Sequence, residues 1–500
     1  MRVPTAALPI LGATLCLMSA VVTSPRSVHA AGSLRRMANG CPMPHKENQA
    51  HITLPSSDAW LSHGVAGTVL NVTGRIVAVR TANNTIATVY VPRGSLAVLP
   101  GQRVAVTGSL RHGVVWASDV RTTGGRPWPA PVTPVQPTGQ IRHVIFIIQE
   151  NHSFDNYFGA YPHVVGLQAG IRLPAASGGA PAVAPFQLHG PLNRDLSHTW
   201  AAAHTAYANG RMNGFVIADR SRDAMGYYTG QEIPNYWYYA SRFTLSDMFF
   251  SSLMGPSLPN HLYTVAGSSG GWIWNMWQPP TGCGFRFPTL ASQLQAAGVS
   301  WKYYSGFPPQ RFWLWDPLPG FPAVTGNPAV RAHLAWDTQY FKDLRQGTLP
   351  AFAWITPNKI ESEHPPADNA LGMWYVTDLL NALGQSRYWR DTAVVVTWDE
   401  YGGFYDGVAP RQVNRFGFGF RVPALVISPY ARAGAVDATL QSFSSVLRYE
   451  ETLQHLPPLD ASVAQAASIG GALDMRQAPL PPALITRPLQ SSAIPASTLP

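Results

Sequence analysis

The chain has 500 residues, of which 46% are apolar and 11% aromatic, and this composition excludes a protein that is disordered throughout. Only 12% of the residues are charged, while 45 prolines and 44 glycines predict a loop-rich fold with interrupted elements. The net charge of +9 favours an anionic substrate or an anionic membrane surface. The lysines and arginines are scattered, and the sequence has neither a run of basic residues nor a stretch in which basic and aromatic residues alternate. We therefore expect no nucleic-acid binding.

The N-terminus has the pattern of an export signal. Arg2 provides the positive end, Ala6 to Val22 forms a short apolar stretch, and Val28-His29-Ala30 places small residues around a cleavage point. The stretch is too short and too interrupted for a membrane anchor. We therefore expect a signal peptide over residues 1–30 and a secreted mature protein. That protein retains Cys41 and Cys283, and the sequence leaves open whether these two cysteines pair.

A small all-β domain is predicted over residues 31–121. Apolar and polar residues alternate from Val65 to Val120, with Gly and Asn turns between four or five short strands. This pattern predicts a small barrel, and an OB-like barrel fits it best. The favoured role is an accessory domain that packs on its neighbour, and the alternative is a module that binds a sugar or an oligonucleotide. A proline-rich linker is expected over residues 122–140.

Continuous apolar runs replace this alternation from residue 141 to residue 474. Such runs predict strands that are buried on both faces of a parallel sheet, at Ile141–Glu150, Thr392–Glu400 and Val422–Tyr430. Helices are expected between them, at Thr289–Ala297, Asp368–Leu383 and Ser442–His455. We therefore predict an α/β domain in which a mostly parallel sheet is sandwiched by helices, followed by a proline-rich tail over residues 475–500.

Two of the predicted strands end in polar residues. The first ends in Glu150 and Asn151, and the second ends in Asp399 and Glu400. Either pair alone is more often a helix cap or a solvated loop, but the carboxyl ends of parallel strands meet at one edge of a sheet. Converging carboxylates repel each other unless a divalent cation neutralises them. An oxygen-only set of ligands favours Ca²⁺, and participation of histidine would favour Zn²⁺.

Five blocks of the sequence also carry a resemblance. They are QENHSFDNYFG (Gln149–Gly159) and the segments Leu196–Phe215, Met225–Tyr263, Trp398–Pro410 and Arg421–Arg432. In this order they resemble a bacterial phosphoesterase family, within the alkaline phosphatase superfamily, that contains phospholipases C and an acid phosphatase. The resemblance covers about residues 141–456 and implies an alkaline-phosphatase-like fold that hydrolyses phosphoric esters.

The resemblance also implies roles for individual residues. Ser257, in GPSLPN, matches a hydroxyl nucleophile that becomes phosphorylated, although by composition alone it would be a turn residue. His198 and His364 match active-site histidines, which supply proton donors to phosphoryl transfer. His261 stands where the family commonly has arginine, and we expect it to bind substrate. The metal-binding positions of the family match Glu150, Asn151, Asp399 and Glu400.

Two positions depart from the family pattern. Gly407 and Ala438 stand where relatives frequently have histidine. The missing nitrogen atoms make a second, nitrogen-rich metal site doubtful and leave room for a slower or differently tuned enzyme.

An aromatic segment follows the nucleophile block and contains Trp272, Trp274 and Trp277. Burial in the core accounts for part of this cluster, while the remaining rings are expected to bind substrate, since tryptophan faces attract quaternary ammonium groups and suit a lipid interface. The sequence thus predicts a secreted, metal-dependent, phospholipase C-like hydrolase that contacts membranes transiently. An acid phosphatase acting on phosphomonoesters is the first alternative, and a non-catalytic protein that binds a surface glycan or polymer is the second.

Overall fold

The computed structural model describes residues 64–92, 96–128, 140–175 and 181–499. The predicted signal peptide and Cys41 lie outside these residues, whereas Cys283 is disulfide-bonded. None of the helices in the described ranges is long and apolar enough to cross a membrane.

The first described segment is a closed five-stranded barrel, which confirms the predicted small β-domain. Its strands are β1 (Val65–Thr73), β2 (Ile76–Thr81), β3 (Ile86–Tyr90), β4 (Arg103–Arg111) and β5 (Val114–Gly124). They are joined in the order β1-β2-β3-β5-β4, and β4 pairs with β1 to close the barrel. Only β3 and β5 pair in parallel. Valine side chains fill the interior, and β5 extends into the predicted linker.

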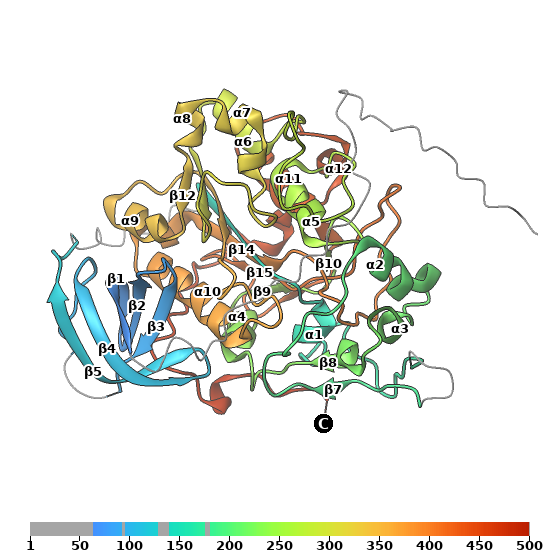
Figure 1. The fold of residues 1–500 in the computed structure, drawn as a ribbon, viewed down its shortest axis with the longest axis horizontal. Helices are drawn as coiled ribbons and strands as arrows, with labels where there is room; N and C mark the ends of the chain where they lie inside the picture. The colour runs from blue at the N-terminus through green and yellow to red at the C-terminus, as the bar shows by residue number, and fades with distance from the viewer. Residues whose placement is uncertain (1–63, 93–95, 129–139, 176–180, 500) are drawn as a thin grey trace, which may run out of the picture. The chain divides into compact units, whose positions relative to one another are not determined.

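An eight-stranded sheet forms the centre of the second domain (Figure 1). Its order is β12 (Leu334–Trp336), β11 (Trp301–Ser305), β13 (Phe352–Thr356), β6 (His143–Gln149), β14 (Thr392–Trp398), β15 (Ala424–Ile427), β9 (Thr244–Ser246) and β16 (Val436–Asp437). The five strands from β12 to β14 run parallel to one another. Nearly every side chain of β6 and β14 is buried, as their continuous apolar runs predict.

One predicted strand runs in the opposite direction from that expected for a parallel sheet. The run Val422–Tyr430 contains β15, which is antiparallel to both β14 and β9. A parallel neighbour needs a crossover that returns the chain to the other end of the sheet, usually through a helix. The connection from Trp398 to Ala424 contains no helix, and the chain re-enters the sheet from the edge at which it left.

Twelve α-helices accompany the sheet in the described residues, together with short strand pairs. The three predicted helices are present as α6 (Leu290–Ala296), α10 (Asn369–Gly384) and α11 (Phe443–Leu453). The others are α1 (Phe154–Phe158), α2 (Trp200–Tyr207), α3 (Phe215–Asp219), α4 (Pro234–Arg242), α5 (Ser257–Ala266), α7 (Pro322–Thr325), α8 (Pro328–Arg331), α9 (Thr338–Gln346) and α12 (Ala461–Gln465). The short pairs are β7 (Phe186–Gln187) with β8 (Gly226–Tyr227), and β10 (Phe249–Phe250) with β17 (Gln441–Ser442).

The barrel packs against α10 and the loop before it through buried polar contacts. Thr88 Oγ1 on β3 donates a hydrogen bond to Asp378 Oδ2 on α10 over 2.7 Å. The backbone N–H of Ile86 donates to the carboxylate of Glu361, which lies three residues before His364 in the sequence. The barrel is therefore attached to the segment that carries one of the predicted active-site histidines.

The proline-rich C-terminal segment also packs on α10. Asn381 Nδ2 donates to the carbonyl of Ile485 over 3.0 Å, and the N–H of Ile485 donates to Asn381 Oδ1 over 3.0 Å. The side chain of Ile485 is buried. The segment over residues 475–500 is thus bound to the domain surface within its described part.

Candidate active site

The four predicted metal-binding residues converge at the carboxyl edge of the sheet. Glu150 and Asn151 follow β6, Asp399 and Glu400 follow β14, and the two strands pair in parallel up to Gln149 and Trp398. The backbone N–H of Asn151 donates to Asp399 Oδ1 over 2.9 Å, and all four side chains are fully buried. The turn after β14 needs glycine at Gly402, because a Cβ there would lie 2.0 Å from the carbonyl oxygen of Asn151.

These residues form a deep cluster that is rich in negative charge. His261 Nε2 lies 2.6 Å from Glu150 Oε1 and 3.8 Å from Asp399 Oδ2. Ligand atoms from these three residues lie within 4.8 Å of one another. Several buried oxygens of the cluster have no hydrogen-bond partner among the described residues, namely Glu150 Oε2, Asp399 Oδ2 and Glu400 Oε1. Buried carboxylate oxygens without donors fit a divalent cation, which would satisfy and neutralise them.

The electrostatics of the deep cluster agree with this fit. Burial and the neighbouring Asp399 raise the pKa of Glu150 well above its usual value. Burial raises the pKa of Glu400 in the same direction, and the charge of Asp399 adds to the effect. Burial lowers the pKa of His261 to about 4, although Asp399 opposes that change. His261 is therefore a neutral imidazole, the form that binds metals.

Ser257 lies next to this cluster as the first residue of α5. Its hydroxyl donates to Asn151 Oδ1 over 3.5 Å, and its side chain is fully buried. The preceding turn is held by Asn260, whose Oδ1 accepts from the backbone N–H of Leu253 over 3.0 Å. The backbone N–H of Leu258 donates to Asn275 Oδ1 over 2.9 Å. Ser257 is thus fixed at the positive end of a helix dipole, where anions are stabilised.

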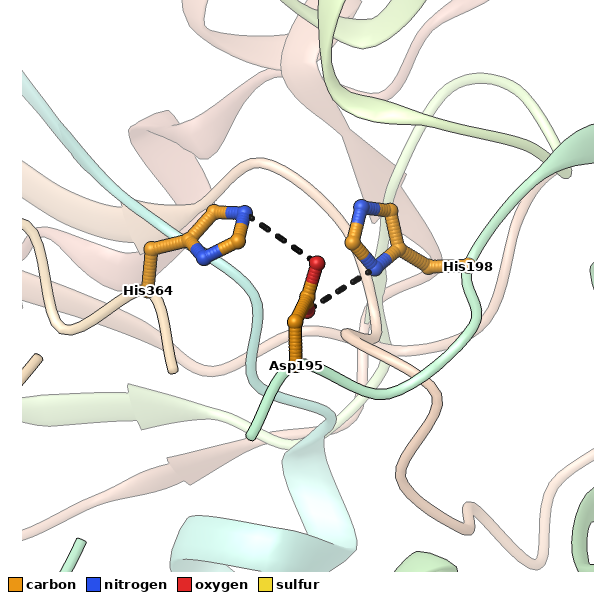
Figure 2. Close-up of side chains that lie close together, drawn as sticks. All are labelled: Asp195, His198 and His364. Carbon is orange, nitrogen blue, oxygen red and sulfur yellow. Dashed lines mark ion pairs between the residues drawn. The ribbon is translucent and has the colours of Figure 1, made fainter. Parts of the chain in front are cut away.

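A second, shallower cluster consists of Asp195, His198 and His364. Figure 2 shows the carboxylate of Asp195 between the two imidazole rings, 3.6 Å from His198 Nδ1 and 4.0 Å from His364 Nε2. The side chain of Asp195 is 41% exposed, whereas those of His198 and His364 are 9% and 5% exposed, so the cluster opens to solvent on the Asp195 side. These three residues also have the spacing of a possible metal site.

Asn151 and Glu400 connect the two clusters. Asn151 Nδ2 lies 3.4 Å from the ring nitrogens of His198, and His198 Nε2 lies 3.8 Å from Glu400 Oε1. Burial alone would lower the pKa of His198, but the carboxylates of Glu400, Asp195 and Asp399 outweigh it and raise the pKa to about 9. His198 therefore carries a proton at neutral pH.

The structure thus brings together the serine, the four strand-end residues and both histidines that the sequence singled out. His261, which is predicted to bind substrate, lies in the deep cluster beside Glu150. Asp195 was not predicted as a site residue. Its only signal in the sequence is its position three residues before His198, and an isolated aspartate at such a position is usually a loop residue.

The three predicted tryptophans differ in their surroundings. The side chain of Trp272 is buried and packs edge-on against Trp274, with ring centroids 5.8 Å apart. Trp274 and Trp277 are partly buried, and Trp277 packs against Trp313 at 5.2 Å. Trp315, two residues further along that loop, lies 5.4 Å from the ring of His364. The aromatic region therefore borders the shallow cluster.

The two departures from the family pattern have different surroundings. The backbone N–H of Gly407 donates to Asp155 Oδ2 over 2.8 Å, beside a buried ion pair in which Arg421 contacts both Asp155 and Asp406. Ala438 follows Asp437, the last residue of β16. Neither position adds a nitrogen atom to the two clusters.

Comparison with known proteins gives the family. The sequence model of the Phosphoesterase family matches residues 141–457. The chain belongs to this family. It is 30% identical to phospholipase C A of Mycobacterium tuberculosis over 63% of this chain and 72% of that protein. It is 29% identical to the non-hemolytic phospholipase C of Burkholderia pseudomallei over 63% of this chain and 55% of that protein. The protein is therefore a phosphoric ester hydrolase.

The solved structures are more distant. A protein in the alkaline phosphatase superfamily from Vibrio parahaemolyticus covers 69% of this chain and 73% of its own, at 11% identity and a TM-score of 0.34. The alkaline-phosphatase-like architecture stays a prediction from the sequence.

In this phosphoesterase, the buried carboxylate of Glu363 connects the segments that carry the site. It accepts hydrogen bonds from Gln149 Nε2 over 3.1 Å and from Trp398 Nε1 over 3.0 Å, at the ends of β6 and β14. It also accepts from the hydroxyls of Tyr157 and Tyr236. Burial raises its pKa to about 7, against the opposing effect of these donors. Since Glu363 precedes His364, one side chain joins three segments of the active site.

We predict that Glu363→Gln lowers turnover by about tenfold or more, the range typical of residues that orient a metal site. The amide group would present two N–H donors to groups that are themselves donors, so the strand ends would shift. Asp343→Asn is the matched control, because Asp343 is equally buried and accepts from Tyr304 and Lys302 far from the two clusters. Turnover should be measured below the unfolding transition of both variants. Equal loss of turnover in both would contradict a specific role for Glu363.

Proposed function

We propose that this phosphoesterase is a secreted, phospholipase C-like enzyme that is metal-dependent and acts through a phosphoserine at Ser257. The observation that supports this proposal best is the position of Ser257. It is the first residue of α5, and it lies beside a deep cluster of three carboxylates, each of which has one oxygen without a donor among the described residues. A serine hydroxyl at neutral pH is a weak nucleophile unless its surroundings stabilise the alkoxide.

The residues of the deep cluster would hold the metal. Glu150, Asp399 and Glu400 supply carboxylate oxygens, Asn151 supplies an amide oxygen, and His261 adds a nitrogen. A divalent cation there would supply Lewis-acid chemistry by neutralising the carboxylates and lowering the pKa of a neighbouring hydroxyl. The oxygen atoms alone favour Ca²⁺, and inclusion of the His261 nitrogen favours Zn²⁺.

The chain's own groups account for the remaining chemistry. The Ser257 hydroxyl releases its proton to solvent and its Oγ forms a bond to phosphorus. The bond from phosphorus to the alcohol oxygen breaks, and His198 donates its proton to that departing oxygen. Nearby carboxylates favour the protonated form of His198. The Nδ1 atoms of His198 and His364 donate to the carbonyls of Leu196 and Pro365 over 2.8 Å, which orients both rings beside Asp195. Water then hydrolyses the phosphoserine. His364, whose ring centre lies 5.7 Å from that of His198, would contact the phosphoryl oxygens.

The substrate is proposed to be a choline-bearing phosphodiester such as phosphatidylcholine. The relatives are phospholipases C, and tryptophan rings border the shallow cluster. Trp313, two residues before Trp315, already faces a cation, because Lys359 Nζ lies 4.7 Å from its ring centre. We infer that the barrel is an OB-like accessory domain that packs on α10. An acid phosphatase remains the competing function, and it is distinguished by comparing turnover of a choline phosphodiester with turnover of a phosphomonoester.

Ser257→Ala is expected to reduce turnover by several orders of magnitude while leaving the free energy of unfolding nearly unchanged. Removal of one hydroxyl creates little cavity, whereas the nucleophile has no substitute. Mass spectrometry of the acid-quenched wild-type enzyme should detect phosphate on the peptide that contains Ser257. Wild-type turnover by the alanine variant would exclude the phosphoserine mechanism.

Asp399→Asn is expected to lower bound metal and turnover together, because it removes a negative charge that faces the cation site. Bound metal should be measured by elemental analysis after dialysis, which also identifies the ion. Asp378→Asn provides a control, since Asp378 is a buried carboxylate on α10 that bonds only to the barrel in the described contacts. Full turnover by chelator-treated, metal-free wild type would refute metal dependence.

Trp274→Ala and Trp277→Ala should separate the two substrate classes. If their rings bind a quaternary ammonium, at least one variant should raise the Michaelis constant for a choline ester roughly 2- to 30-fold and spare a generic aryl phosphate. Trp272→Phe tests packing alone, because Trp272 is buried. A wild type that prefers monoesters at acidic pH, with no variant that discriminates, would favour the acid phosphatase.

A further inference from the structure

A second feature of the carboxyl edge is a groove of about 660 Å³ beside the outermost strand, β12. Its walls come from the end of β2 in the barrel, the loop after β11, β12 itself and the start of α9. The charged residues that line it are all basic, namely Arg80, Arg311 and Lys342. The groove is thus a concave surface of one charge, built by both domains.

The three cations are available to a ligand. None of them forms an ion pair within the described part of the chain, and Arg311 is exposed. The nearest acidic residues in sequence are engaged elsewhere or buried. Asp343, which follows Lys342, accepts from Lys302 and Tyr304 on β11. Asp337 is fully buried, and its carboxylate interacts electrostatically with Arg80.

Two further features of the walls suit an anionic headgroup at a lipid interface. The nine-residue helix α9 begins at Thr338 in the groove wall, so the positive end of its dipole adds to the three cations. Trp336, at the end of β12, is one of the exposed large hydrophobic residues of the protein, at 36%. Exposed tryptophan beside basic residues is typical of proteins that lie at a bilayer surface.

The groove lies at the same edge of the sheet as the active site. Trp336 pairs with Ser305 on β11, which pairs with Thr356 on β13, and β13 pairs in parallel with β6. Three strand spacings, about 14 Å, therefore separate Trp336 from the end of β6. The loop that contributes Arg311 continues to Trp315, which contacts His364.

We propose that this groove docks the enzyme on an anionic lipid surface by binding phosphate-bearing headgroups. The proposal rests on the proposed function, because docking at this edge would present the active site to lipid in the same membrane. The occupant we commit to is a bilayer that contains anionic lipid, since the groove combines positive charge with an exposed indole.

The test compares two double variants that lose the same charge. Arg311→Gln with Lys342→Gln removes two cations from the groove. Arg142→Gln with Arg387→Gln removes two from a smaller hollow of about 330 Å³ at the opposite edge, where β6 and β14 begin. That hollow is lined by Arg142, Arg387 and Arg390, together with Asp391, which pairs with Arg390. Each protein is sedimented with vesicles of phosphatidylcholine, with and without phosphatidylglycerol, in the Ser257→Ala background to prevent hydrolysis.

The groove variant is expected to bind anionic vesicles about 25-fold more weakly, at roughly fivefold per cation near a charged membrane. The control variant should bind like its parent, and added salt should reduce the difference. Equal losses in the two variants, or unchanged binding by the groove variant, would overturn the proposal. Loss of binding to soluble polyphosphate with retained vesicle binding would also overturn it.

Turnover of a soluble short-chain ester separates this proposal from the proposed function. With Ser257 present, the groove variant should hydrolyse that ester at the wild-type rate and lose activity only on anionic vesicles. A wild type that hydrolyses no phospholipid would refute the proposed function, yet the vesicle-binding comparison would still decide whether the groove binds anionic lipid.

Discussion

The active site depends on one constraint, which is that three separate chain segments must end within a few ångströms of one another. The carboxylate of Glu363 meets this constraint because its four donors come from the end of β6, the end of β14, α1 and α4. A buried carboxylate is costly unless its lone pairs are satisfied. The four donors offset that cost only when all the segments are in place. The interaction therefore couples the position of His364 to the positions of Glu150 and Asp399.

The active site has acidic groups in its deep cluster and histidines in its shallow cluster. The deep cluster concentrates carboxylates, and burial makes their ionised forms unfavourable in the absence of a cation. The shallow cluster contains His198 and the partly exposed carboxylate of Asp195, which lies 3.6 Å from its ring. Asn151 stands between the two, with its amide oxygen facing Ser257 and its amide nitrogen facing His198. A phosphoryl group on Ser257 would thus lie between the deep cluster, which would bind the cation, and the histidines of the shallow cluster, which would donate protons. Phosphoryl transfer requires both.

The sequence predicts this arrangement where local pattern determines position. The apolar runs that precede Glu150 and Asp399 indicate buried strands, and parallel pairing brings their ends together. The direction of a strand cannot be predicted in the same way, because an apolar run such as Val422–Tyr430 reads the same for a parallel and an antiparallel strand. The connection that precedes β15 contains no helix, and this makes β15 antiparallel to β14. The barrel was predictable because the alternation of apolar and polar residues along its strands is a local signal, as are the apolar runs of β6 and β14.

The supporting residues could not be found in this way. Glu363 lies in a polar loop between Glu361 and two prolines, where an acidic residue is usually solvated. Its partners Tyr157, Tyr236 and Trp398 are spread over more than two hundred residues, and nothing in the chain signals that they converge on one carboxylate. Asp195 is similar, because its role comes from the approach of His364, which is far away in the sequence.

The barrel's contacts show how an added domain can affect a site without contributing a catalytic group. Its β3 strand donates to Glu361 and Asp378, so it packs on the loop that precedes His364 and on α10. Its β2 strand places Arg80 at the basic groove beside β12. Both contacts lie on the side of the sheet that begins at β12, whereas the antiparallel strands lie beyond β14. The barrel therefore reaches both the loop that precedes His364 and the groove beside β12, while the deep cluster itself is built from residues of the second domain.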